Sequence, residues 1–127
     1  ALCRNNARLN LSAKLSKKMR SVSLVETAME YIRIHYNEQI KIETIANACG
    51  YSKSNFCKTF KQILGQTFHN TLNEYRVNIA CIFLTETNES IEDITSKVGF
   101  LDAKSFCRVF KQKKATSPKQ YRKHNVE

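Results

Sequence analysis

Residues 42–61 read IETIANACGYSKSNFCKTFK, and residues 91–111 read IEDITSKVGFLDAKSFCRVFK. Both stretches begin with largely apolar positions spaced i, i+3, i+4 and i+7. They continue with a glycine and an aromatic residue, and they end with two phenylalanines four positions apart. The second stretch starts 49 residues after the first and carries one extra residue in its turn. This order predicts a short amphipathic helix, a glycine turn and a second amphipathic helix, so the chain contains two helix-turn-helix units.

The residues at the ends of these helices support the prediction. Gly50 and Gly99 directly follow the last periodic residue of each first helix, where a left-handed backbone commonly ends a helix. Ser52 and Asp102 are good N-caps for the second helices. Ser90 opens an S-x-x-D capping box before the second unit.

The second helix of each unit has one apolar and one cationic face. On a helical wheel, the phenylalanines point one way and most of the cations point the other way. The predicted inward residues are Phe56, Phe60 and Ile63 in the first unit and Phe106 and Phe110 in the second. The predicted outward residues are Ser54, Lys58 and Lys61 in the first unit and Lys104, Arg108 and Lys111 in the second.

A cationic face opposite an apolar core is expected of a helix that enters the major groove of DNA. Residues near its N-terminus approach base edges, whereas later cations meet phosphates. The predicted base contacts are Ser54, Lys58, Lys104, Ser105 and Arg108, and the predicted phosphate contacts are Lys53, Lys61 and Lys111. Arg76, on the helix between the units, is a candidate either for a phosphate contact or for locking helices together.

Five cysteines lie at positions 3, 49, 57, 81 and 107. Their spacing fits neither a zinc site nor a disulfide framework, so we expect no metal and no cofactor. Cys57 and Cys107 flank the outward faces. Each is a candidate for touching a thymine methyl or for sensing oxidation, and the alternative is a half-buried spacer.

Supporting helices are expected around the two units. Ser23 and Glu26 have capping-box spacing, from which we expect a helix that begins at Ser23 and fades near residue 37. A connecting helix is expected over residues 67–86, and a short last helix at Ser117, which precedes the only proline. The expected apolar stripe of the connecting helix comprises Leu72, Tyr75, Ile79, Ile82 and Phe83.

These elements divide the chain into four parts. Residues 1–21 form a basic leader or linker, 22–66 a first helix-turn-helix subdomain, 67–87 the connecting helix and 88–127 a second helix-turn-helix subdomain. The first 20 residues hold six cations and no acidic residue. We interpret them as a solvated linker, and the alternative is a basic arm that touches DNA phosphate.

Composition limits the function. The 127 residues include 21 Lys and Arg against 11 Asp and Glu, and the net charge of +10 suits a polyanion such as nucleic acid or an acidic membrane surface. No apolar run approaches the roughly 20 residues of a membrane span, so no membrane partner is expected. No nucleophile has an adjacent base at a recognisable spacing, which argues against an enzyme. A protein-interaction module that has lost DNA binding is the remaining alternative, and the outward cations argue against it.

The spacing of several blocks resembles that of the AraC/XylS transcriptional regulators. The blocks are Ile91 to Ile94, Val98-Gly99-Phe100, Ser105 to Lys111, and Ser117-Pro118 with Tyr121-Arg122. The first unit repeats the pattern less closely, and the resemblance covers about residues 22–124. Ala115 departs from it, because glycine is usual there and the first unit has Gly65.

The resemblance implies an all-α domain of about seven helices, whose two recognition helices each enter a major groove. It places base contacts at Ser54, Cys57, Lys58, Lys104, Ser105 and Arg108. It also implies a sequence-specific regulator in the bacterial cytosol, associated with the nucleoid, that binds double-stranded promoter or operator DNA. RNA polymerase is a further candidate partner. We expect a dimerisation or effector domain to lie outside this segment.

Overall fold

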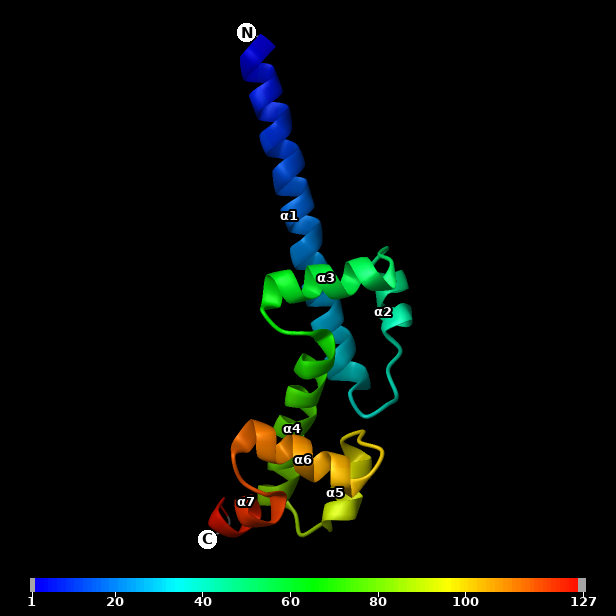
Figure 1. Ribbon diagram of the computed structural model, residues 1–127, viewed down its shortest axis with the longest axis vertical. Helices are drawn as coiled ribbons and strands as arrows, with labels where there is room; N and C mark the ends of the chain where they lie inside the picture. Colours follow the sequence, from blue (N-terminus) through cyan, green and yellow to red (C-terminus); the bar gives the residue numbers. More distant parts are fainter. Residues whose placement is uncertain (1, 126–127) are drawn as a thin grey trace.

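The computed structural model describes the backbone of residues 2–125 and the side chains of residues 14–125 (Figure 1). The described part is all-α, as predicted, and has no strand. Its helices are α1 (Leu2–His35), α2 (Ile42–Ala48), α3 (Lys53–Leu64), α4 (Phe68–Glu86), α5 (Ile91–Lys97), α6 (Ala103–Lys114) and α7 (Pro118–Asn125). None of these helices is both long and apolar enough to cross a membrane.

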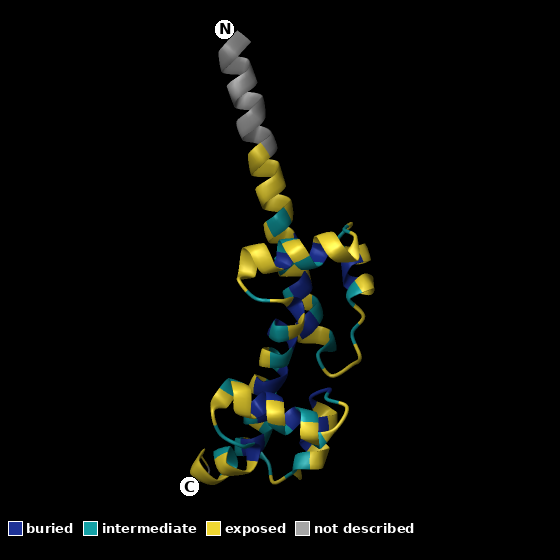
Figure 2. Ribbon diagram, viewed as in Figure 1, coloured by how far each residue is buried: buried dark blue, intermediate teal, exposed yellow. Residues whose placement is uncertain are grey.

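Two separate cores lie one after the other along the molecule (Figure 2). The first core is enclosed by α1, α2, α3 and the beginning of α4, and the second by the end of α4 with α5, α6 and α7. The connecting helix α4 was expected from the sequence, and the structure shows that it contributes to both cores. Each core therefore contains one helix-turn-helix, α2–α3 or α5–α6, and one supporting helix on either side of it.

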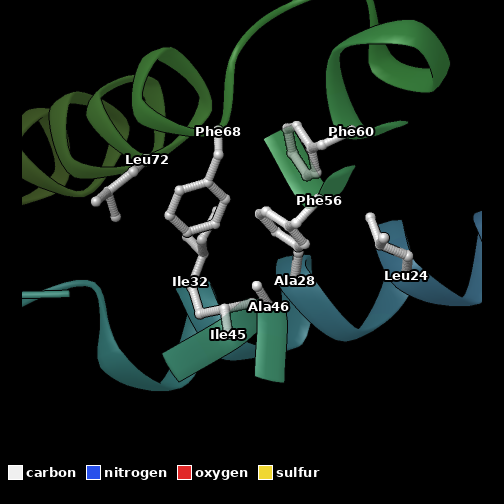
Figure 3. Packing of buried hydrophobic residues seen from close by; sticks show 9 residues of the cluster. All are labelled: Leu24, Ala28, Ile32, Ile45, Ala46, Phe56, Phe60, Phe68 and Leu72. Atoms are coloured by element: carbon white, nitrogen blue, oxygen red, sulfur yellow. The ribbon is translucent and has the colours of Figure 1, made fainter. Parts of the chain in front are cut away.

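Aromatic rings hold helix α3 in place (Figure 3). Phe56 and Phe60 are fully buried, and the ring of each meets the ring of Phe68 on α4 edge-on, at 5.8 and 5.6 Å between centroids. Leu24 and Ala28 of α1 close the same core from the other side. Phe106 and Phe110 are likewise fully buried in the second unit. The predicted inward positions of the four phenylalanines are therefore confirmed.

The predicted caps and turns are present. Ser52 accepts a hydrogen bond from the Asn55 amide at 3.2 Å, and the Asp102 carboxylate accepts one from the Ser105 amide at 2.7 Å. Gly99 has a φ of +97°, in the left-handed region that favours glycine. Ala115 ends α6 in the same left-handed region, with a φ of +61°, although it carries a side chain.

Three expectations are wrong. α1 starts at Leu2 and not at Ser23, because residues 14–22 contain no glycine or proline that would stop a helix there. Ile63 is exposed, since it lies in the last turn of α3, which extends past α1 (Figure 1). Ile82 is also exposed, because the second half of α4 buries a different face from the first half, with Val77, Ala80 and Leu84 in the core.

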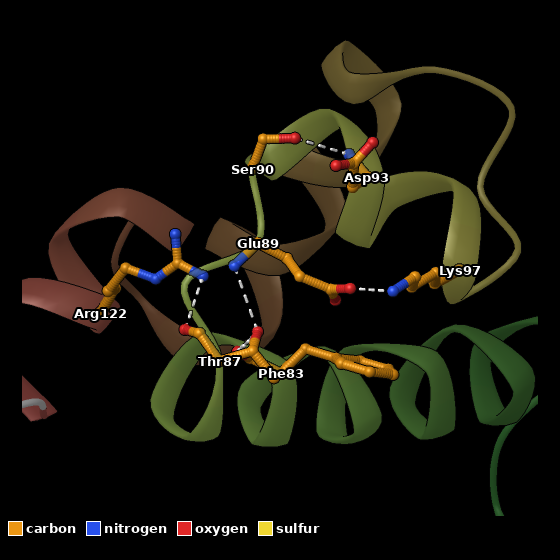
Figure 4. Close-up of polar contacts among 7 residues, drawn as sticks. All are labelled: Phe83, Thr87, Glu89, Ser90, Asp93, Lys97 and Arg122. Carbon is orange, nitrogen blue, oxygen red and sulfur yellow. Dashed lines mark hydrogen bonds and ion pairs between the residues drawn. The ribbon is translucent and has the colours of Figure 1, made fainter.

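In each unit, one arginine donates hydrogen bonds to backbone carbonyls at the end of the preceding long helix. In the second unit, Arg122 of α7 donates from Nε to the carbonyl of Leu84 at 3.1 Å. It also donates from Nη2 to the carbonyl of Thr87 at 3.3 Å (Figure 4). These carbonyls belong to the last turn and the C-cap of α4, where carbonyl oxygens receive no hydrogen bond from a following turn of the helix. They are therefore free to accept one from a side chain. In the first unit, Arg76 of α4 plays the equivalent part at the end of α1.

Candidate nucleic-acid interface

The cations of α3 and α6 point away from their cores, as predicted. Ser54, Lys58 and Lys61 are exposed on α3, and Lys104, Arg108 and Lys111 are exposed on α6. Figure 1 shows α3 and α6 crossing in front of the long helices on which they pack, in similar directions. The two cationic faces therefore lie on one side of an elongated molecule.

Two carboxylates border the cationic faces. Glu43 of α2 forms an ion pair with Lys53 at the start of α3, with 3.2 Å between the Lys53 Nζ and a Glu43 carboxylate oxygen. Asp102 caps α6, and hydrogen bonds from Ser105 lower the pKa of its carboxyl, with smaller contributions from the charges of Arg108 and Lys104. Both carboxylates are therefore ionised at neutral pH, and they lie beside the N-termini of α3 and α6.

Three predicted base-contact or flanking residues are only partly exposed. Cys57 is half-buried against the first core and Cys107 against the second. Burial raises the pKa of the Cys107 thiol, and the charge of Glu92 adds to this effect. Ser105 is also half-buried, whereas its neighbours Lys104 and Arg108 are exposed. These packing contacts support the spacer interpretation of the cysteines.

The predicted phosphate contact of Arg76 is wrong. Its side chain is 6% exposed, and its guanidinium donates from Nε to the Tyr36 carbonyl at 2.7 Å and from Nη2 to the Glu38 carbonyl at 2.8 Å. The guanidinium also lies over the ring of Phe100, 5.6 Å from its centroid. Burial lowers the pKa of Arg76, yet an arginine stays protonated in a protein. Arg76 therefore locks helices together, which is the other role that the sequence left open.

Arg76 lies at the junction between the two units. The turn of the second unit packs so closely here that a Cβ on Gly99 would lie 2.6 Å from the Tyr36 carbonyl oxygen and 3.0 Å from Arg76 Nε. Gln39 donates from its side-chain amide to the Gly99 carbonyl at 3.3 Å. The segment that follows α1 thus touches the turn that precedes α6, and this contact fixes one unit against the other.

The chain matches a known protein family and several of its members. A family model described as a helix-turn-helix domain matches residues 45–124. An HTH-type transcriptional regulator of Staphylococcus aureus strain COL is 39% identical over 98 residues, and the xylose operon regulatory protein of Escherichia coli K12 is 37% identical over 100 residues. The chain belongs to the AraC/XylS family.

Solved structures agree with this assignment. The C-terminal domain of AraT, a response regulator from Geobacillus stearothermophilus, has a TM-score of 0.77 and 28% identity, and the match covers 82% of this chain and 87% of AraT's. The DNA-binding domain of AdpA, solved in complex with a target DNA, has a TM-score of 0.73 and 25% identity, with 80% and 90% covered. The chain described here is thus an AraC-type helix-turn-helix DNA-binding domain.

The AraC-type domain is a small part of its relatives. The match to the Staphylococcus aureus protein covers 77% of this chain but 13% of that protein, and the match to the xylose operon regulatory protein covers 79% of this chain and 26% of that protein. The two proteins therefore contain long regions beyond the part that this chain resembles.

Sequence reasoning missed most of the residues that orient the two units of this AraC-type domain. Gln39 and the carbonyls of Tyr36 and Glu38 meet Arg76 only in the folded chain, and backbone acceptors leave no pattern in a sequence. The hydrogen bond from Arg122 to the end of α4 was missed for the same reason. The glycine at position 99 was predicted for its left-handed backbone, although its lack of a side chain is also needed at the junction.

Proposed function

We propose that this domain reads two successive major grooves of one DNA duplex, one with α3 and the other with α6. The arrangement of the two helices on one side of the molecule carries this proposal (Figure 1). Helix α4, which joins them, has 19 residues. At 1.5 Å per residue it is about 28 Å long, which approaches the 34–36 Å advance of one turn of B-DNA.

The base contacts proposed for the two helices differ. In the second unit, Arg108 is long enough to bind guanine O6 and N7 with two hydrogen bonds, and Lys104 and Ser105 lie beside it near the start of α6. In the first unit the corresponding positions offer Lys58 with two small residues, Ser54 and Cys57. Because the two faces differ, each domain should recognise an asymmetric site composed of two unlike elements.

The phosphate contacts proposed for the domain are Lys53, Lys61 and Lys111, which are exposed at the edges of the recognition helices. Lys53 would exchange its ion pair with Glu43 for a phosphate, since exposed ion pairs of this kind contribute little to stability. Lys61 and Lys111 lie in later turns of α3 and α6 and require no such exchange. Contacts to phosphate position the helices in the grooves, whereas the base contacts give the specificity.

Altering the spacing of the two elements tests the proposal. A specific site is first selected from a random DNA library, and about half a helical turn is then inserted between its elements. The insertion places one element on the far side of the duplex, out of reach of a domain with a fixed junction. Specific affinity should fall to the non-specific level, and a full-turn insertion should not restore it.

The matched control places the same extra base pairs outside the site, where affinity should not change. If the half-turn insertion between the elements leaves affinity unchanged, a single unit reads the DNA and the other unit only supports it. In that case, substitutions on one recognition helix alone would change the selected sequence.

We infer that the full-length protein regulates transcription in the bacterial cytosol, on nucleoid DNA. The names of the relatives and the fold of this domain support this inference. RNA polymerase and an additional dimerising or effector-binding region are proposed partners of the domain in that process. A promoter-reporter assay with and without the domain's cationic residues would test the regulatory role.

A further inference from the structure

We propose that Lys17 and Arg20 of α1 bind DNA phosphates on the outer wall of the groove that α3 enters. The inference rests on the proposed function, and it extends the interface beyond the two recognition helices. Figure 1 shows that α1 continues past α3 on the side away from the second unit. Residues 14–20 lie in this projecting part and are all exposed.

Lys17 and Arg20 lie on the face of α1 that packs against α3. On a helical wheel with 100° per residue, Lys17 lies about 20° and Arg20 about 40° from Leu24. Leu24 is buried in the first core with Phe56 and Phe60 (Figure 3). The two cations therefore continue, further along α1, the face that carries the recognition helix.

A hollow joins these cations to the recognition helix itself. It has a volume of about 430 Å³ and is lined by residues of α1, of the Gly50-Tyr51 turn and of α3. Lys17, Arg20 and Ser21 contribute from α1, and Asn55 and Thr59 contribute from α3. Such a mixture of cations, hydroxyls and an amide provides the donors that phosphate oxygens accept from.

The spacing along α1 matches the width of a major groove. Arg20 and Lys17 precede Leu24 by four and seven residues, which correspond to about 6 and 10 Å along the helix axis. The major groove is about 12 Å wide, so its phosphate walls lie roughly 6 Å from its centre. With α3 in the groove, the two cations reach the level of the wall that faces away from the second unit.

Nothing in the described part of the chain neutralises these cations. Neither Lys17 nor Arg20 has an ion-pair partner among the described residues. The first acidic residue in the sequence is Glu26, which lies on the opposite face of α1. The two charges therefore remain available to a polyanion.

The test compares K17Q/R20Q with K18Q on the selected two-element site. Lys18 has the same charge and similar exposure, but it lines a different hollow with Leu15, Met19 and Val22 on the other side of α1. Because each phosphate contact contributes about one to the slope of log K against log salt, K17Q/R20Q should lower that slope by about two for any DNA sequence. K18Q should keep the wild-type slope.

Neutral methylphosphonate linkages then locate the contact. Placed on the outer wall next to the first element, they should weaken the wild type and K18Q but leave K17Q/R20Q unaffected. Placed beyond the second element, they should affect all three proteins alike. A wild-type slope for K17Q/R20Q, or equal loss from the outer-wall linkages in all three proteins, overturns the inference while two-groove reading stands. Failure of the wild type to bind any selected site overturns the proposed function instead.

Discussion

Substituting alanine for glycine in the two equivalent turns should have unequal effects. Gly50 and Gly99 both have a left-handed backbone, with φ of +76° and +97°. A side chain in this region costs about 1–2 kcal/mol. A Cβ on Gly50 would meet nothing within 4 Å, so Gly50→Ala should lower the free energy of unfolding by about that amount and no more.

Gly99→Ala adds a steric clash to the same backbone cost. Its Cβ would lie 2.6 Å from the Tyr36 carbonyl oxygen and 3.0 Å from the Asn37 Cα, and neither backbone atom can move alone. Overpacking of this kind typically costs a further 1–3 kcal/mol. The total loss should therefore be about 2–5 kcal/mol, a large share of the stability of a small domain.

The clash should also change DNA binding, because relieving it moves the second unit away from the first. Urea titrations of both variants give the free energies of unfolding. DNA binding is then measured at a low temperature at which circular dichroism shows both variants folded. Gly99→Ala should lose preference for the correctly spaced site while keeping non-specific affinity, whereas Gly50→Ala should keep both. Equal destabilisation of the two variants, with equal spacing preference, would refute this account of the junction.

Three further predictions concern the recognition helices and their ends. Arg108→Ala should lose about 1–3 kcal/mol of specific binding and relax the preference at one base pair. Lys61→Ala should weaken binding to all sequences and lower the slope of log K against log salt by about one. Salt titrations on specific and random duplexes would show both effects. Phe60→Ala and Phe110→Ala should each lower the free energy of unfolding by about 3–5 kcal/mol, and an unchanged thermal midpoint would contradict their burial. Ala115→Gly should raise the thermal midpoint, because it removes a left-handed alanine that costs about 1–2 kcal/mol. A lower midpoint would count against strain at this turn.

The recognition helices were predictable because their signals are local. Phenylalanines four residues apart and a capping residue at each start define both the helix and its buried face, and the structure confirms them. Local signals failed where tertiary contacts decide the outcome. Ile63 fits the apolar periodicity of α3, but it is exposed because the end of α3 extends beyond the helix on which α3 packs. Ile82 fits the apolar stripe expected for α4, but α4 buries a different face in the second unit from the one it buries in the first.

The candidate site was predicted only in part, for a related reason. A helical wheel identifies an outward face, so the exposure of Lys58, Lys104 and Arg108 followed from the sequence. The same reasoning could not separate an exposed arginine from a buried one at position 76, because its partners are carbonyls 38 and 40 residues away. The start of α1 was missed as well, since a capping signal at Ser23 does not prevent a helix from running through it.

The contact between Arg76 and two backbone carbonyls has a consequence for how the domain responds to its surroundings. Its acceptors are uncharged, it is shielded from solvent, and its charge does not titrate in the physiological range. Mobile ions therefore screen it little, whereas they compete directly with every lysine that meets a phosphate. A change in ionic strength should alter how long the domain stays on DNA and leave unchanged the distance between sequence elements that it accepts.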